Sequence, residues 1–355
     1  MTESLFIELL QTALGLRQIL CKEPSDKEWA DLYDMCGKQA VVGFAFLGVK
    51  ALQKEGYKIP QSLLFEWIGN NNLIESRNCQ LNQQVVEVSE YFKKAGFQTC
   101  LLKGQGNAQM YSNTLSRMPG DIDLWVSGGK DKVCQFVKQR YPNAKECGWH
   151  IDYPIFSDVP VEIHFKPGYA RLPKYDKRLQ DYFEKNAEPQ FGHHIHLYKT
   201  EGTVSVPTFE FNVVLQLSHI MRHFMIEGIG MRHIIDIYYL LTNSENQQSN
   251  HADLNELLRY LGLARFASAV MWIMKDVFFL DETRLICKSN RERGKLLLDE
   301  ILNGGNFGRY DKRKTGMLAS LWGFYPFASR ALRLVWLFPE EAIITPLCRR
   351  IRIIN

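Results

Sequence analysis

The sequence predicts an α+β protein in which a small mixed β-sheet core is flanked by N- and C-terminal helical regions. Two observations carry this prediction. Apolar residues recur at helical spacing from residue 4 to 94 and again beyond Pro207. Between these stretches, short apolar runs alternate with helical patterns. We therefore expect helices in residues 1–95, an α/β core in residues 96–206, and helices again in residues 207–355.

The N-terminal region is expected to be a series of helices separated by proline and glycine. Its first residues, MTESLFIELLQTALGLRQIL, form an amphipathic pattern, and Glu3 and Glu8 lie where a secretory signal peptide would be apolar. No apolar stretch reaches the roughly eighteen residues that a membrane span needs. We therefore expect a soluble, cytoplasmic protein with no transmembrane segment.

The central region is expected to alternate strands with helices. The expected strands are short apolar runs, at residues 97–102, 121–126, 144–150, 161–165 and 203–206. Helices are expected in KGQGNAQMYSN and in DKVCQFVKQRY, which follow glycine turns. Residues 168–189 are rich in proline and charge, which indicates a connection. The run from Thr208 to Leu241 returns to the helical period.

Composition and charge restrict the partners. The hydrophobic content of 46% is enough for a core, and the net charge of +4 is too small to predict a nucleic-acid partner. Residues 309–355 carry nine Arg or Lys against three Asp or Glu. Arginines such as Arg330, Arg333 and Arg349 could contact a membrane surface, a nucleic acid or a partner protein, or could face outward on a packed helix. The eight cysteines form no CxxC pair, so we expect reduced, buried thiols.

Two aspartates in DIDLWV are the first candidates for a functional site. Side chains alternate between the two faces of a strand, so Asp121 and Asp123 share one face while Ile122 and Leu124 pack the other. Two adjacent carboxylates repel each other unless a cation lies between them, and Mg²⁺ is the usual partner of such oxygens. The pattern therefore indicates a metal site.

VEIHF repeats this arrangement on a second strand. Glu162 and His164 share one face, and Glu162 is the expected third carboxylate. Three such carboxylates can hold two metal ions roughly 3.5–4 Å apart, an arrangement that stabilises phosphoryl transfer. His164 is expected to support packing, with orienting a carboxylate or contacting the acceptor as alternatives.

Three residues upstream are candidates for phosphate binding. Lys103 and Gly104 lie where a strand ends and a helix begins, a position that favours phosphate, although most glycines there simply make the turn. Arg117 precedes the acidic strand and could reach a phosphate, or could be a solvated loop arginine.

The stretch LLKGQGNAQMYSNTLSRMPGDIDLWV followed by VEIHF resembles the polymerase-beta-like nucleotidyltransferase superfamily, and within it the bacterial branch of uncharacterised nucleotidyltransferases. A KG turn replaces the usual GS turn of the superfamily. The resemblance covers residues 97–165 and extends loosely to SHIMRHF, GMRHIIDIYYLL and GGNFG. It implies metal binding at Asp121 and Asp123, a third carboxylate at Glu162, and a phosphate contact at Lys103 and Gly104.

The expected activity is Mg²⁺-dependent transfer of a nucleoside monophosphate from an NTP such as ATP to an acceptor hydroxyl. Asp121 and Asp123 would bridge two Mg²⁺ ions, and Glu162 would complete the site or accept the proton of the acceptor. The alternative is a non-catalytic scaffold or regulator that binds a nucleotide or a partner. A nucleic-acid-binding accessory has only the basic tail as support. The acceptor, the choice of NTP and the oligomeric state stay open.

Several histidines could form other sites. His219 and His223 lie one helical turn apart and could bind zinc, but HIMRH lacks the glutamate of a metalloprotease motif, which favours structural or substrate-facing histidines. The HHIH segment, residues 193–196, is expected to be an exposed loop. Arg232 and Asp236 could pair along a helix or close over a nucleotide.

Overall fold

The computed structural model describes residues 2–243, 251–314 and 325–343. Within these residues the chain divides into two compact units. The helical unit comprises the residues up to 71, residues 170–176 and the residues from 217 onward, and the sheet unit comprises residues 72–169 and 177–216. Each unit is therefore assembled from segments that are far apart in the sequence.

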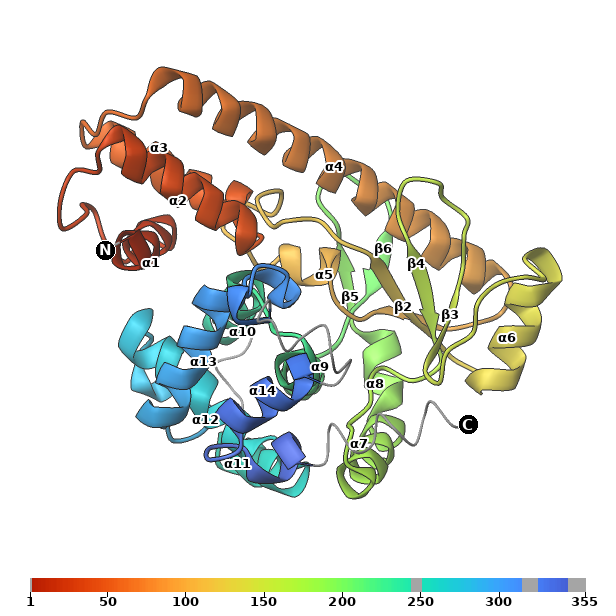
Figure 1. The fold of residues 1–355 in the computed structure, drawn as a ribbon. Helices are drawn as coiled ribbons and strands as arrows, with labels where there is room; N and C mark the ends of the chain where they lie inside the picture. Colours follow the sequence, from red (N-terminus) through yellow and green to blue (C-terminus); the bar gives the residue numbers. More distant parts are fainter. Residues whose placement is uncertain (1, 244–250, 315–324, 344–355) are drawn as a thin grey trace. The chain divides into compact units, whose positions relative to one another are not determined.

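A mixed sheet of four strands forms the centre of the sheet unit (Figure 1). In spatial order its strands are β1 (Thr99–Leu101), β2 (Ile122–Val126), β4 (Val161–His164) and β3 (His150–Asp152). The central pair β2 and β4 is parallel, and the two outer pairs are antiparallel. The expected α+β fold with a small mixed sheet is confirmed. In the parallel register Asp123 lies opposite Glu162, which places the two acidic residues side by side.

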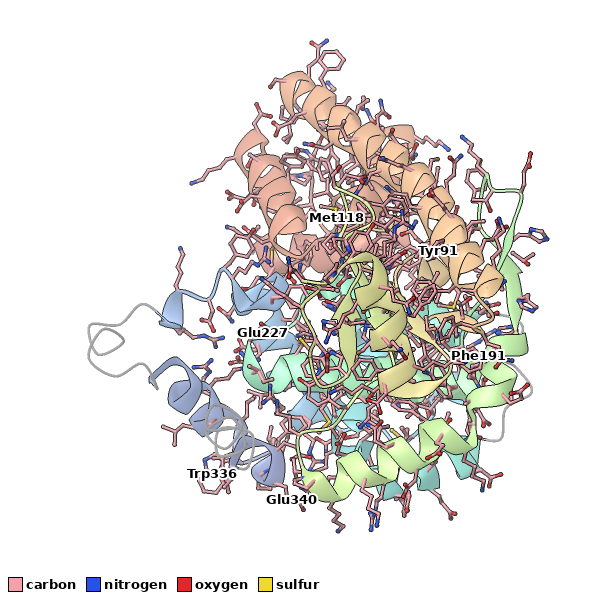
Figure 2. All side chains as sticks on the ribbon, turned by 90° about the vertical axis from the view of Figure 1, so that its right-hand side faces the viewer. Tyr91, Met118, Phe191, Glu227, Trp336 and Glu340 are labelled. Carbon is pink, nitrogen blue, oxygen red and sulfur yellow. The ribbon has the colours of Figure 1, made fainter. Side chains whose placement is uncertain are left out.

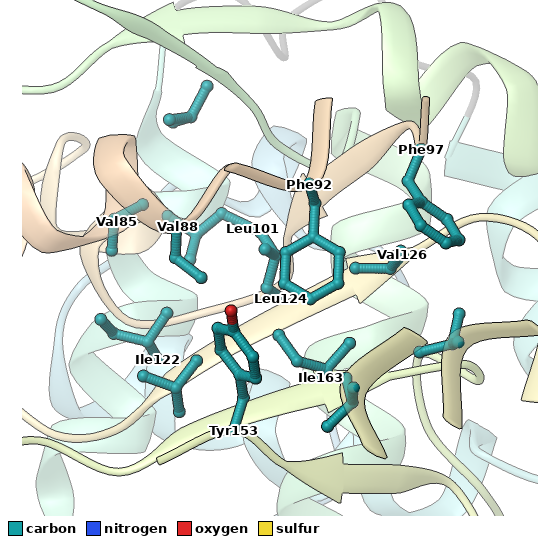
Figure 3. Close-up of a cluster of buried hydrophobic side chains, with 14 of the residues drawn as sticks. Val85, Val88, Phe92, Phe97, Leu101, Ile122, Leu124, Val126, Tyr153 and Ile163 are labelled. Atoms are coloured by element: carbon teal, nitrogen blue, oxygen red, sulfur yellow. The ribbon is translucent and has the colours of Figure 1, made fainter. Parts of the chain in front are cut away.

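One face of this sheet forms the hydrophobic core of the unit. Figure 3 shows Ile122, Leu124 and Ile163 beneath Val88 and Phe92 of α4 (Gln61–Lys94), and all five side chains are buried. Because strand residues alternate between faces, the residues between them point to the other side of the sheet. The expected division of β2 and β4 into an apolar face and a polar face is therefore observed.

The polar face is partly covered by aromatic side chains. Trp125 of β2 packs on Phe191 of α8 (Ala187–Gly192), with ring centroids 4.6 Å apart, and on Phe211 at the start of α9 (Phe209–Ile226). Phe191 is labelled in Figure 2. Trp125 is buried, as are Asp123 and His164, whereas Asp121 is exposed and the side chains of Glu162 and Asp152 are 28% and 46% exposed.

Two parts of the sheet unit differ from the sequence predictions. The strand expected at residues 144–150 is instead β3 at 150–152, because the chain turns at Gly148 and pairs residues 145–147 with β3. The connection expected at 168–189 contains α7 (Pro173–Lys185) and α8. Pro173 is the first residue of α7, a position that suits proline. The buried residues of α7 are Leu179 and Phe183, and its charged residues are not buried.

The segment HHIH is a strand and not the expected loop. β5 (His194–His196) pairs with β6 (Thr203–Ser205) in a separate two-stranded sheet. His194 and His196 are exposed, as expected, because the outward face of a strand in this small sheet meets solvent. The helix that follows β6 begins at Phe209.

The helical unit joins the two ends of the chain. Its N-terminal helices are α1 (Thr2–Ala13), α2 (Asp26–Lys38), α3 (Val42–Lys54) and the first part of α4. Its other helices are the end of α9, α10 (Met231–Thr242), α11 (His251–Tyr260), α12 (Ala264–Trp272), α13 (Arg291–Gly304) and α14 (Tyr325–Leu334). Ser25 and Glu28 cap α2 reciprocally. No helix in the described residues is long and apolar enough to cross a membrane.

Glu300 on α13 is the centre of a buried ion network. Its carboxylate lies 2.7 Å from Arg330 Nη1, 2.8 Å from Arg333 Nε and 2.9 Å from Arg313 Nη1. Asp311 lies 2.8 Å from Arg313 Nε. We call these five residues the arginine network. Arg330 is 1% exposed, so it neither faces outward on its helix nor is open to a membrane surface, a nucleic acid or a partner, which were the alternatives for the arginines of this tail.

The remaining tail arginines, Arg349, Arg350 and Arg352, lie outside the described residues, and so does Cys348. Trp336, at the end of the described tail, is exposed (Figure 2). The seven cysteines of the described ranges are free, and Cys36, Cys100 and Cys134 are buried. Cys21 and Cys147 are exposed, so the expectation of buried thiols holds only in part.

Candidate metal and nucleotide site

Asp123 is the buried centre of the polar face. Its side chain is 3% exposed, and its Oδ1 atom lies 3.0 Å from Lys103 Nζ and 2.9 Å from His164 Nε2. Burial alone would raise the pKa of Asp123, but the charge of Lys103 and the hydrogen bond with His164 outweigh burial and lower the pKa. Asp123 therefore stays ionised in the folded protein.

Asp121 lies immediately before β2 and is exposed. The negative charge of Asp123 raises the pKa of Asp121, and partial burial adds to this effect, whereas the positive charge of Lys103 opposes it without cancelling it. The repulsion between Asp121 and Asp123 is therefore not fully compensated by the positive charges of the protein. A bound cation would remove it.

Glu162 completes a group of three carboxylates. Asp121, Asp123 and Glu162 each offer an oxygen atom, and these oxygens lie within 4.8 Å of one another. Burial would raise the pKa of Glu162, but the hydrogen bond with His164 offsets burial and the pKa is lowered. We call these three residues the carboxylate site. The three residues meet as expected from the sequence, and their role as metal ligands stays a prediction.

His164 connects two of the carboxylates. Its Nε2 atom lies 2.9 Å from Asp123 and 3.3 Å from Glu162, and its Nδ1 atom lies 3.2 Å from the carbonyl oxygen of Lys166. Burial would lower the pKa of His164, but the bonds with Asp123 and Glu162 raise it. This position suits the alternative role, that of orienting a carboxylate.

Two polar residues of β3 belong to the same face and were not predicted. His150 lies opposite His164 and Asp152 lies opposite Glu162 in the antiparallel register. His150 is buried, and Asp152 is half-buried. The alternation in HIDY could have indicated them, but the strand was expected to end at His150, which removed Asp152 from consideration.

Lys103 and Gly104 form the turn beside the aspartates. Gly104 has a φ of +62°, a region that favours glycine, and an added Cβ would lie 3.4 Å from the backbone oxygen of Asp121. The helix that follows, α5 (Gln105–Ala108), is only four residues long, shorter than expected, so its dipole is weak. Lys103 Nζ contacts Asp123. The contact of Lys103 and Gly104 with phosphate stays a prediction.

Arg117 is buried in the loop before β2. Its side chain donates to the carbonyl oxygen of Met118 at 3.3 Å, and its own carbonyl oxygen accepts a bond from Asn78 of α4 at 2.8 Å. Only 6% of Arg117 is exposed, so it is not a solvated loop arginine. Its contact with a phosphate stays a prediction.

A cavity opens beside Glu162. It has a volume of about 380 Å³ and lies within the β3–β4 hairpin. Asp152, Tyr153, Phe156 and Glu162 are among the residues that line it. Its walls combine carboxylates with aromatic side chains, so it offers polar and apolar contacts to a small molecule.

The histidines of α9 form a different polar cluster in the helical unit. His219 and His223 have ring centroids 4.5 Å apart, and His223 Nδ1 bonds with Glu227. Within the described ranges, neither histidine belongs to a group of three possible metal ligands. The zinc alternative for HIMRH therefore gains no support.

The comparison with protein families assigns the chain. The model of a family described as uncharacterised nucleotidyltransferase matches residues 25–279, more than two thirds of the 355 residues. The chain belongs to this family. The match includes every residue of the carboxylate site, together with Lys103 and Arg117. The comparisons with curated proteins and with solved structures find no match.

Proposed function

We propose that this protein is a Mg²⁺-dependent nucleotidyltransferase of the polymerase-beta-like type, which transfers a nucleoside monophosphate from an NTP to an acceptor hydroxyl. The observation that carries the proposal is the carboxylate site, in which Asp123 and Glu162 lie opposite each other on neighbouring parallel strands and Asp121 adjoins them. Membership of a nucleotidyltransferase family supports the same reaction class.

The donor set fits magnesium. Its three ligands are carboxylates, which Mg²⁺ prefers, and their charge exceeds that of the nearby ammonium of Lys103. The raised pKa of Asp121 is the direct sign of this excess. Bound Mg²⁺ would neutralise the charge of the triphosphate and of the leaving pyrophosphate.

The residues of the chain have separate roles in the proposed reaction. The acceptor oxygen attacks the α-phosphorus of the NTP, the bond to pyrophosphate breaks, and Glu162 is placed to take the proton of the acceptor hydroxyl at its carboxylate. His164 holds the carboxylates of Asp123 and Glu162 in position. The ammonium of Lys103 lies where it can contact a phosphate beside Asp123. The cavity beside Glu162 offers space for the acceptor.

The test is a screen for transfer. The purified protein is incubated with Mg²⁺, each of the four common NTPs, and sets of sugars, nucleosides, hydroxyl-bearing peptides and RNA ends, and pyrophosphate and adducts are measured by mass spectrometry. We expect pyrophosphate release with at least one NTP and acceptor, and its loss in Asp121→Asn. If the protein binds Mg²⁺ and NTP but transfers to no acceptor, the regulator alternative replaces the enzyme. Absence of any Mg²⁺-dependent NTP binding would contradict the enzyme and the nucleotide-binding regulator, and would leave only a scaffold that binds a partner.

A further inference from the structure

The two histidines of the polar face form a second possible metal site with Glu162. We propose that His150, His164 and Glu162 bind a transition ion such as Zn²⁺, and that this site and the Mg²⁺ site compete for Glu162. The binding of Zn²⁺ requires only these three residues. The competition rests on the proposed function, because it assumes that Glu162 also holds Mg²⁺.

The spacing of the three ligand atoms suits a small tetrahedral ion. Glu162 Oε2 lies 3.2 Å from His150 Nδ1 and 3.3 Å from His164 Nε2. All three residues can offer ligand atoms within 4.8 Å of one another. Bonds of about 2.0–2.1 Å in tetrahedral geometry place neighbouring ligand atoms about 3.3–3.4 Å apart. Small adjustments would therefore bring the three atoms around one ion.

A second observation points to a ligand at His150. This residue is 7% exposed, and its Nδ1 atom makes no hydrogen bond within the described residues. Its approach to Glu162 has the distance of an ion pair but not the direction of a hydrogen bond. A buried ring nitrogen without a hydrogen bond is unfavourable, whereas a metal ion would use its lone pair.

Each ring has an inner nitrogen near Glu162, which is Nδ1 in His150 and Nε2 in His164, and an outer nitrogen that lies near another oxygen atom. His164 Nδ1 lies 3.2 Å from the carbonyl oxygen of Lys166, and His150 Nε2 lies 3.5 Å from Asp152 Oδ1. When the outer nitrogen carries the proton and donates it to oxygen, the inner nitrogen keeps its lone pair for the metal. The inner nitrogen of His150, Nδ1, lies 3.2 Å from Glu162. The inner nitrogen of His164, Nε2, lies 3.3 Å from Glu162 and 2.9 Å from Asp123, and it gives up its hydrogen bond with Asp123 when it binds the metal.

The chemistry of the ligands separates the two sites. Imidazole suits zinc, copper, iron and nickel, whereas the carboxylates of the Mg²⁺ site suit a hard ion. Glu162 is common to both groups of three ligands. When Zn²⁺ holds the Glu162 carboxylate between the histidines, Asp121 and Asp123 lose their third partner, and the affinity of the carboxylate site for its own ion falls.

The first experiment is calorimetric titration of Zn²⁺ into protein that has been stripped of metal with EDTA. We expect His150→Gln to weaken Zn²⁺ binding by at least about tenfold, because the loss of an outer partner alone costs about 10–100-fold. Asp121→Asn, which leaves all three ligands in place, is expected to bind Zn²⁺ normally. His194→Gln is the control for adventitious binding, because His194 is exposed on β5.

Unchanged Zn²⁺ affinity in His150→Gln, or loss of binding only in His194→Gln, would overturn the proposed site. Thermal melting of each variant checks that it is folded. A folded His164→Gln variant should also lose Zn²⁺, which keeps the proposal testable if His150→Gln does not fold. These outcomes do not depend on nucleotidyl transfer, so failure of the Zn²⁺ site and failure of the proposed function are distinguishable.

The second experiment tests the sharing of Glu162. Mn²⁺ replaces Mg²⁺ as a spectroscopic probe, and free Mn²⁺ is measured by electron paramagnetic resonance with and without Zn²⁺. Release of Mn²⁺ by one equivalent of Zn²⁺ is expected in the wild-type protein and not in His150→Gln. If Zn²⁺ binds but leaves bound Mn²⁺ unchanged in the wild-type protein, the competition is refuted.

Discussion

The carboxylate site and the arginine network both gather charged side chains, but they differ in balance. In the arginine network two carboxylates meet three guanidinium groups, and the opposite charges are in contact. In the carboxylate site three carboxylates share one ammonium, that of Lys103, and the histidine His164. In the first group each carboxylate has an arginine partner within the protein. The second has an excess of negative charge.

The carboxyl pKa values show the same difference. Burial would raise the pKa values of Glu300 and Asp311, yet the neighbouring arginines outweigh it and both pKa values are lowered. In the carboxylate site the pKa of Asp121 is raised, chiefly by the charge of Asp123. A charged cluster thus indicates a binding site when a carboxylate lies beside negative charge that the protein does not compensate, and a structural role when each carboxylate has a cationic partner.

The largest expected effect is on the arginine network. Glu300→Gln should lower the free energy of unfolding by about 3–5 kcal/mol, because it leaves the buried charge of Arg330 without its partner. Denaturant unfolding measures this loss. The control is Glu340→Gln, since Glu340 makes an exposed ion pair with Arg265 and accepts an exposed hydrogen bond from Tyr175, and its replacement should change stability by less than about 1 kcal/mol. Equal effects of the two variants would contradict a structural role for the network.

The two aspartates of the carboxylate site should differ in stability. Asp123→Asn removes the charged partner of both Lys103 and His164 in a buried position and should destabilise the fold by about 1–3 kcal/mol. Asp121→Asn should leave stability unchanged or raise it. Thermal melting without metal separates the two variants. A destabilised Asp121→Asn with an unaffected Asp123→Asn would reverse our assignment of the two environments.

Lys103 should affect nucleotide binding more than metal binding. Removing its ammonium in Lys103→Ala is expected to weaken NTP affinity in Mg²⁺ by about tenfold, the effect of one charge-assisted hydrogen bond of roughly 1.5 kcal/mol. Calorimetry with a non-hydrolysable NTP measures it, and Lys138→Ala, which breaks only an exposed pair with Glu146, is the control. Unchanged NTP affinity in Lys103→Ala would limit Lys103 to its contact with Asp123.

The smallest expected effect is a pH dependence. A carboxyl group whose pKa is raised by folding favours the folded state at low pH, and this contribution is lost as the pH rises through the raised pKa. The metal-free wild-type protein should therefore be less stable than Asp121→Asn at pH 7, by under about 1 kcal/mol for this exposed group. Near pH 3, below the ordinary Asp pKa of about 3.9, the difference should vanish. A difference that grows towards low pH would contradict the repulsion between the two aspartates.

The sequence predicted the carboxylate site because strand geometry is local. Alternation along DIDLWV and VEIHF placed Asp123, Glu162 and His164 on polar faces, and the parallel pairing of these two short strands brings those faces together. The contribution of β3 was missed because the turn at Gly148 shifted the strand, and no local pattern fixes where such a turn falls.

The arginine network could not be predicted because its partners are distant in the sequence. Arg330 lies 30 residues from Glu300, and an arginine among apolar residues gives no sign of whether its charge faces solvent or a buried carboxylate. The helix α7 was missed for a related reason, because its many charges hid the two buried residues, Leu179 and Phe183. The burial of Arg330 and the formation of α7 both depend on packing against residues that are distant in the sequence.

The most direct test of the central claim is calorimetric binding of a non-hydrolysable NTP with Mg²⁺ and with EDTA. The wild-type protein should bind the nucleotide in Mg²⁺, and its affinity should fall at least about a hundredfold in EDTA. Mutation of a residue that only orients a metal ligand costs about 10–100-fold, and loss of the metal itself should cost more. Asp121→Asn and Glu162→Gln, each with one ligand fewer, should lose most of the Mg²⁺-dependent gain while keeping a normal melting temperature. Equal nucleotide affinity in Mg²⁺ and EDTA, or full Mg²⁺-dependent affinity in both folded variants, would contradict the carboxylate site.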